Sequence, residues 1–213
     1  AYESHQYTYS TLLAGSIKKD LFYSRAKNFS SYRAKALFSE NIPVEVYDNL
    51  LDSVHQNLEP LYKYFDLRKR LLELDELHIY DCNVALVKDM KWHMPFEQAA
   101  EEIKSALKPL GEEYVEQLGR GLSVDRWTDR YENKGKRSGA YSSGCYDSNP
   151  FILMNYREDN INSAYTLAHE AGHSMHSFYS RKNQPYLYSD YTIFVAEVAS
   201  TFNEALLTRH FLS

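Results

Sequence analysis

The sequence predicts a mainly α-helical protein with one small antiparallel β-sheet. Apolar residues recur every three to four positions through much of the first 120 residues, which is the period of an amphipathic helix. Two short stretches, "GAYSSGCY" and "PFILMNY", instead favour strands joined by turn residues. Two more helical patterns follow them. The chain has 213 residues, 44% of them hydrophobic, and is therefore long enough to bury a core.

Three helical segments are expected before the sheet. The first covers about residues 4–36, where leucine and isoleucine recur at helical spacing. The second covers residues 43–74, and Pro43 suits its first turn. The third covers residues 94–122 and should be interrupted at Pro109, because proline cannot continue a helical ladder.

Two helices are expected after the sheet. "REDNINSAYTLAHEAGHSMHSFYSRK" offers Asp159 or Asn160 as an N-cap and carries basic residues near its end. "YTIFVAEVASTFNEALLTRHFL" has the length of a second long helix, and the chain stops within that helical pattern, which suggests a piece of a longer protein. We therefore divide the chain into a helical part, residues 1–120, and a part with the sheet and the last two helices, residues 121–213.

Charge and composition exclude several classes of function. The formal net charge is -5, and the lysines and arginines are scattered, so nucleic acid is not an expected partner. The sequence has no apolar run of the roughly 20 residues that a membrane helix needs. Cys82 and Cys145 form neither a CxxC pair nor a disulfide framework, which favours a reducing compartment. A cytoplasmic protein without a membrane partner is expected.

The segment "TLAHEAGHSMH" has the spacing of a zinc site. His169 and His173 stand at positions i and i+4, so on a helix both imidazoles project from one face and can bind one ion. Glu170 lies between them, where a carboxylate can act as the general base toward water. The alternative is a helix that is simply rich in histidine, but the helical context and the small residues Ala171 and Gly172 favour the metal.

The third protein ligand cannot be chosen by spacing. Glu197 and Glu204 are seven residues apart on the last helix, and either could face the histidines if the two helices fold back on each other. His176 lies about 10 Å along the helix from His169, from the rise per residue, which argues against both binding one ion. We expect His176 to support the site or to pack beside it.

These motifs together resemble peptidase family M3, and within it the oligoendopeptidase F group. The resemblance rests on "HEAGHSMH", on "FVAEVASTFNEALL" after it and on "GKRSGAYSSGCYDSNPFILMNY" before it. It implies a zincin-like metallopeptidase with an elongated helical, neurolysin-like architecture, and it implies one Zn²⁺ per chain. By the family pattern E-x-x-S-x-x-x-E, Glu197 would be the third zinc ligand, Ser200 would follow it, and Glu204 would be a supporting carboxylate.

The resemblance also implies the substrate and what this chain lacks. Short peptides would bind along an extended strand that includes Gly139, Ala140 and Tyr141, although an ordinary hairpin is the alternative for that stretch. The donors that stabilise the tetrahedral oxyanion would come from a segment further toward the C-terminus of the same protein. We therefore expect a zinc endopeptidase of oligopeptides, present as a fragment with an incomplete catalytic site. The alternative is a non-catalytic helical module that binds zinc or peptide.

Overall fold

The computed structural model describes residues 2–87 and 91–213. The chain divides into two compact units, Ala1–Lys88 and Asp89–Ser213, and each is described by itself. This division lies earlier than the one that we drew at residue 120. The reason is that the helices of residues 96–122 pack against the last two helices and so belong to the second unit.

The first unit consists of helices. Its elements are η1 (Glu3–His5), α1 (Gln6–Ala26), α2 (Tyr32–Phe38), α3 (Val44–Gln56), α4 (Glu59–Leu71) and η2 (Ile79–Asn83). The helix expected over residues 4–36 is thus two helices. Asn28 adopts a left-handed conformation between them, with a φ of 57°, and the Ser31 hydroxyl accepts a hydrogen bond from the Ala34 N–H as the N-cap of α2.

The first unit buries almost nothing. Of its described residues, only Ser24 and Arg68 are buried, and the apolar residues of α1 and α3 are largely exposed. The Arg68 guanidinium donates to the carbonyl oxygens of Asp81 and Val84 at 2.8 and 2.7 Å, which ties the segment containing η2 to α4.

The second unit is mainly helical with a small sheet. Its elements are α5 (Phe96–Ala106), η3 (Lys108–Leu110), α6 (Glu112–Leu122), β1 (Thr128–Asp129), β2 (Tyr141–Ser143), β3 (Phe151–Leu153), α7 (Ile161–Asn183), η4 (Tyr186–Tyr188) and α8 (Ile193–Leu212). The predicted interruption near Pro109 is confirmed. Asn160 is the N-cap of α7, and its side chain accepts a hydrogen bond from the Asn162 N–H.

The sheet has three strands in the order β1-β3-β2. β2 and β3 pair antiparallel as predicted, with Ser142 opposite Ile152. The structure adds a third strand to the expected antiparallel pair: β1 pairs parallel with β3, so the sheet is mixed. β1 has only two residues, which is too short for a strand periodicity to show in the sequence. β2 is left as an edge strand.

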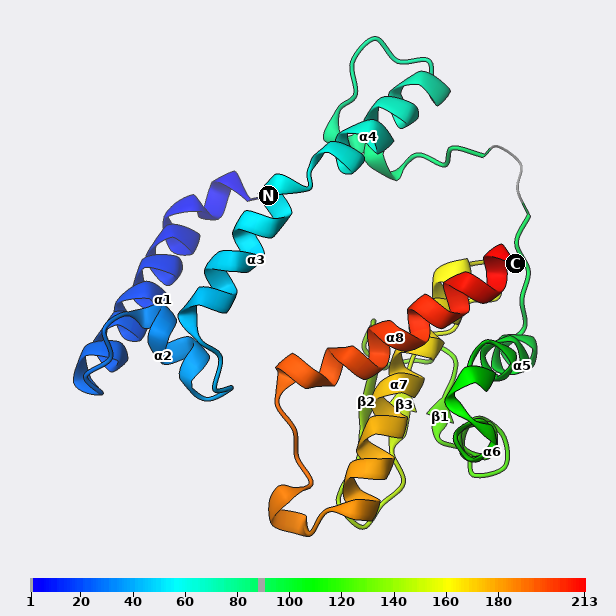
Figure 1. Cartoon of the computed structure of the whole chain (residues 1–213). Coiled ribbons are helices and arrows are strands. Elements are labelled where there is room, and N and C mark those ends of the chain that lie inside the picture. The colour runs from blue at the N-terminus through cyan, green and yellow to red at the C-terminus, as the bar shows by residue number, and fades with distance from the viewer. Residues whose placement is uncertain (1, 88–90) are drawn as a thin grey trace. The chain divides into compact units, whose positions relative to one another are not determined.

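The core of the second unit surrounds α7. Buried apolar residues come from α5, α6, β3, α7 and α8, among them Phe96 and Leu167, and from the connecting segments, among them Trp127. α7 and α8 pack against each other and cross at an angle, and they diverge toward the loop that joins them (Figure 1). At their crossing, a Cβ added to Gly172 would lie 2.7 Å from the Ala199 carbonyl oxygen, so only glycine permits this approach.

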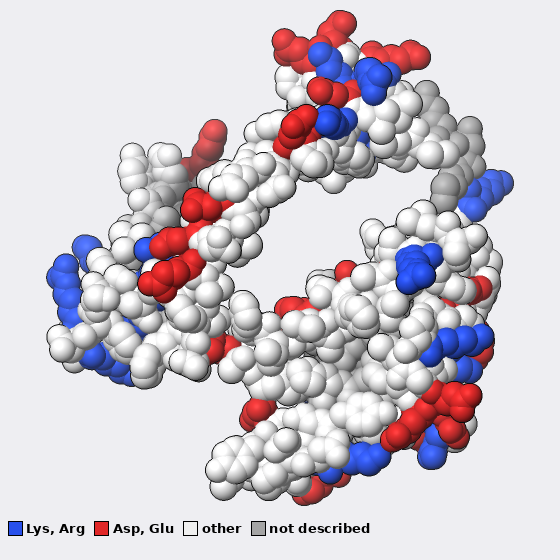
Figure 2. Space-filling model, in the orientation of Figure 1, with Lys and Arg blue, Asp and Glu red and all other residues white. Residues whose placement is uncertain are grey.

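The surface carries charges of both signs. On the face drawn in Figure 2, basic and acidic side chains are spread over the molecule, and the connection between α7 and α8 is largely uncharged. That connection exposes Tyr186, Leu187 and Tyr188. Within the described residues, no helix has both the length and the apolar character that crossing a bilayer requires.

Candidate metal centre

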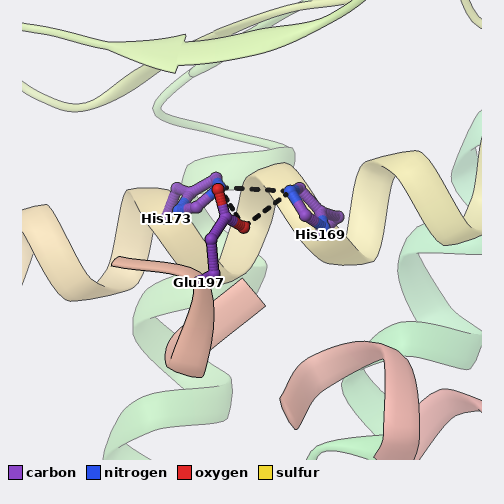
Figure 3. Close-up of side chains that lie close together, drawn as sticks. All are labelled: His169, His173 and Glu197. Atoms are coloured by element: carbon purple, nitrogen blue, oxygen red, sulfur yellow. Dashed lines mark hydrogen bonds and ion pairs between the residues drawn. The ribbon is translucent and has the colours of Figure 1, made fainter. Parts of the chain in front are cut away.

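Helix α7 presents two imidazoles on one face. His169 and His173 are separated by one turn, and their Nε2 atoms lie 3.1 Å apart (Figure 3). Both rings are partly buried. Burial is the largest influence on His173 and lowers its pKa, since it disfavours the charged form. The neutral imidazole that results is the form that binds a metal.

Glu197 of α8 completes the cluster. Its Oε2 atom lies 3.5 Å from the Nε2 atoms of both histidines. The Ser200 hydroxyl, which is fully buried, donates to the same Oε2 atom at 2.7 Å and so holds the carboxylate in place. The close crossing of α7 and α8 at Gly172 brings this glutamate opposite the histidines. Among the described residues, these three side chains form the cluster of histidines and carboxylates placed so that it could hold a metal ion.

The geometry of this cluster fits zinc. Tetrahedral zinc with bonds of about 2.0 to 2.2 Å places neighbouring ligand atoms about 3.3 to 3.6 Å apart. The two separations of 3.5 Å lie within this range, and the separation of 3.1 Å between the two Nε2 atoms lies slightly below it. Two imidazoles and a carboxylate are also a donor set that zinc commonly takes, with a fourth position left for water.

Glu204 contacts the opposite side of one imidazole. Its Oε1 atom lies 2.6 Å from His169 Nδ1. If Nδ1–H donates to this carboxylate, the lone pair of Nε2 is left facing the cluster, which is the usual arrangement around a metal-binding histidine. Spacing had left Glu197 and Glu204 open as ligands. The structure brings Glu197 to the two Nε2 atoms and Glu204 to the far side of His169.

Glu170 lies beside the cluster and is only 7% exposed. Burial raises the pKa of its carboxyl group, and the nearby His169 and a hydrogen bond from the Ser142 main-chain N–H act in the opposite direction. Glu170, His169 and Glu204 line one open pocket of about 650 Å³. A buried carboxylate with a raised pKa in a pocket beside a metal-binding group has the properties of a general base.

The three residues predicted to bind substrate differ in whether they lie at the pocket beside Glu170. Ala140 lines the same pocket as Glu170. Gly139 adopts a φ of +93°, and its carbonyl oxygen accepts a hydrogen bond from Asn155 Nδ2 at 3.0 Å, so it serves the turn. Tyr141 is exposed and lines a different pocket beside β1 and β3. The structure thus brings Ala140, but not the Tyr141 side chain, to the site.

His176 does not join the cluster. Its ring stacks on Tyr191, with ring centroids 3.7 Å apart. The rise along the helix had predicted this separation. Sequence reasoning missed the part played by Ser142, whose N–H reaches Glu170, and by Asn203, whose amide donates to the Ala168 carbonyl at 3.1 Å. No residue spacing signals either contact, because each joins elements that are distant in sequence.

A helix with two histidines and a glutamate, facing a glutamate on a second helix and lying beside an edge strand, is the arrangement of a metallopeptidase. The model of peptidase family M3 matches residues 1–212, and the chain belongs to this family. Within the family it belongs to the oligoendopeptidase F group. It is 53% identical over 212 residues to oligopeptidase PepF of Bacillus subtilis and 43% identical over 211 residues to an oligoendopeptidase F homolog of Borreliella burgdorferi.

Solved structures agree with this assignment. A protein of Chlamydophila abortus described as a peptidase matches with a TM-score of 0.82 and 45% identity over 99% of this chain and 35% of its own. Oligoendopeptidase F of Enterococcus faecium matches with a TM-score of 0.61 and 32% identity over 99% of this chain and 29% of its own. The matches to the two curated relatives include 100% and 99% of the residues of this chain. The chain spans only 31% and 36% of their lengths.

Proposed function

We propose that this chain carries the metal site of a zinc-dependent endopeptidase that hydrolyses short oligopeptides. The observation that carries the proposal is the convergence of His169, His173 and Glu197, with Glu170 buried beside them at an open pocket. Membership of family M3 supports a peptidase in particular. The cytoplasmic location predicted from the sequence is part of the same proposal.

His169, His173 and Glu197 would hold one Zn²⁺ per chain. When bound, zinc would supply a Lewis acid that lowers the pKa of water and polarises the peptide carbonyl. Glu204 would fix the His169 ring through Nδ1, and Ser200 would fix the Glu197 carboxylate.

Glu170 would be the general base. It would accept a proton from the attacking water and later deliver that proton to the leaving amine. Two features of its surroundings suit this role. Burial raises the pKa of the carboxyl group, and the Ser142 N–H lies close enough to favour the charged carboxylate.

An extended peptide would bind along the free edge of β2. An edge strand offers unpaired main-chain groups to which a peptide can add as a further strand. Ala140 is the residue of the predicted "SGAYS" segment that lines the pocket with Glu170, and its main chain is therefore the part that would pair with substrate.

The remaining catalytic groups would come from further polypeptide. Donors to the tetrahedral oxyanion are needed besides the metal. The relatives are about three times as long as this chain, since it spans 31% and 36% of two of them. We propose that a longer polypeptide that includes a C-terminal part supplies those donors, and that the 213 residues alone are inactive.

The test is metal content together with peptide cleavage. We expect about one zinc per chain in the purified 213-residue polypeptide, and cleavage of a short quenched fluorescent peptide only by the longer polypeptide. Failure to bind zinc, even after zinc is added, would contradict the proposal. Zinc binding without cleavage by either form would favour the alternative, a non-catalytic module that binds zinc or peptide.

A further inference from the structure

Strand β2 directs its main-chain groups toward Glu170. The N–H groups of Ile152 and Met154 in and just after β3 donate to Trp127 and Asp129, on the β1 side. In an antiparallel pair the residue opposite Ile152 therefore points its N–H and C=O away from β3, toward the free edge of the sheet. That residue is Ser142, and its N–H lies toward the Glu170 carboxylate, whose pKa it lowers.

The side chain of the same residue contacts α7. The Oγ atoms of Ser142 and Ser174 lie 2.8 Å apart. Ser174 is fully buried and follows Glu170 by four residues, so the two lie one helical turn apart on the same face. Ser142 thus contacts α7 through its hydroxyl, and its N–H lies toward Glu170, one turn earlier on the same helix.

The Ser174 hydroxyl is not explained by packing alone. Alanine would fill nearly the same space in this apolar surrounding without needing a hydrogen-bond partner. The hydroxyl forms a hydrogen bond that alanine cannot form, and a hydrogen bond fixes both the distance and the direction between a strand and a helix.

We propose that the Ser142–Ser174 hydroxyl pair fixes the distance between the edge strand β2 and helix α7, so that the Ser142 N–H is held on the Glu170 carboxylate. Ser174 is a positioning residue that acts through Ser142. The consequence for catalysis rests on the proposed function, but the link between strand and helix does not. Because the Ser142 N–H is directed at Glu170, it is not available to pair with a peptide. The main-chain groups of this edge that can pair with a peptide therefore begin at Ala140.

The experiment uses four variants of the longer polypeptide: Ser174→Ala, Ser142→Ala, the double variant, and Ser142→Thr, which keeps the hydroxyl. The matched control is Ser180→Ala, since Ser180 lies on the same helix and donates to the Ser189 carbonyl at 2.6 Å, away from Glu170. Amide hydrogen exchange of residues 140–144, zinc content, kcat and KM are measured for each.

Both alanine variants should speed amide exchange in residues 140–144 about fivefold, the factor for loss of one ordinary hydrogen bond. They should lower kcat on the order of tenfold with KM nearly unchanged, since a misplaced base slows the chemical step. The double variant should be no worse than either single variant, because the two hydroxyls act as a unit. Ser142→Thr, which keeps the hydroxyl, should recover slower exchange and higher kcat compared with Ser142→Ala, and Ser180→Ala should resemble the parent.

Two results overturn the proposal. One is unchanged exchange in residues 140–144 in both alanine variants. The other is that the parent cleaves peptide and the Ser174→Ala variant loses thermal stability but has the same kcat as the parent. Ser174 would then be merely structural. If instead the parent does not cleave peptide but Ser174→Ala speeds exchange at residues 140–144, the link between strand and helix stands and the proposed function fails.

Discussion

At the scale of single residues, two glutamates of one helix differ in which nitrogen they face. Glu197 lies 3.5 Å from two Nε2 atoms, and Glu204 lies 2.6 Å from His169 Nδ1. The first position suits a metal ligand and the second suits an orienting carboxylate. Replacing each glutamate by glutamine separates these two roles from that of Glu170.

Glu170→Gln should keep zinc and abolish peptide cleavage in the longer polypeptide. The amide has nearly the shape of the carboxylate, and Glu170 is not among the three residues that converge as candidate ligands. It cannot accept the proton, so kcat should fall at least about 100-fold, within the range for general-base loss. Zinc content and kcat are measured on the same preparation. Turnover near that of the parent would remove Glu170 as the base.

Glu197→Gln should lower metal occupancy far more than Glu204→Gln. Loss of a partner that orients a metal-binding histidine costs about 10- to 100-fold in affinity, and loss of a charged ligand should cost more. The measurement is zinc retained after dialysis against a series of chelator concentrations. The two substitutions are chemically the same and lie on the same helix, so each is the control for the other. The opposite ranking would mean that the two roles are exchanged.

The sequence predicted some of these residues and contacts but not others. His169 and His173 could be paired from their spacing because both lie within one helix, where i and i+4 share a face. Spacing left Glu197 and Glu204 open, since it does not contain the crossing of two helices, and only the resemblance to family M3 pointed to Glu197. The Ser142 contact to Glu170 depends on strand register and on the placement of a helix against a sheet, and it was therefore missed.

At the scale of elements, the site depends on how closely α7 approaches α8. A Cβ at Gly172 would lie 2.7 Å from both the Ala199 carbonyl oxygen and Ser200 Cα, which are rigid main-chain atoms. The crossing is therefore set by the absence of a side chain at a single position. Ser200 at this crossing also holds Glu197, so the closeness of the helices and the geometry of the metal group are linked.

Gly172→Ala should weaken both folding and zinc binding. The helices must separate to admit the methyl group, which should cost about 1–3 kcal/mol of unfolding free energy, as overpacking does. Glu197 would move away from the histidines, so zinc affinity should fall as well. Denaturant unfolding and chelator competition measure the two effects.

Gly119→Ala is the matched control for this change. Gly119 also lies inside a helix, but a Cβ there would meet only the flexible end of the Lys104 side chain, at 3.0 Å. Alanine has the higher helix propensity, so stability should hold or rise slightly, and zinc affinity should not change. A loss of zinc affinity in Gly119→Ala equal to that in Gly172→Ala would show that the crossing is not what places Glu197.

At the scale of the whole molecule, the two compact units differ in what they bury. The apolar core lies in the second unit, where α7 is surrounded by α5, α6, α8 and the sheet. The described helices of the first unit leave their apolar residues largely in solvent, among them Leu12, Leu13, Ile17 and Phe22. The helical period that predicted these segments is an amphipathic pattern, and such a pattern requires a partner for its apolar face. Length and periodicity predicted the helices but could not say that the described residues of the first unit supply no such partner for one another.

Amide hydrogen exchange in the 213-residue polypeptide should therefore be uneven. Helices with few buried apolar contacts open at low free energy, so amides of α1 and α3 should exchange at least about tenfold faster than those of α5 and α7. If further chain covers the apolar faces of the first unit in the longer polypeptide, the protection of this unit should rise toward that of the second. The amides of α7 serve as the internal reference, since the helix is packed on several sides in the 213 residues alone. Equal protection of both units in the short polypeptide would contradict this account, because it would mean that the first unit is stable without a buried core.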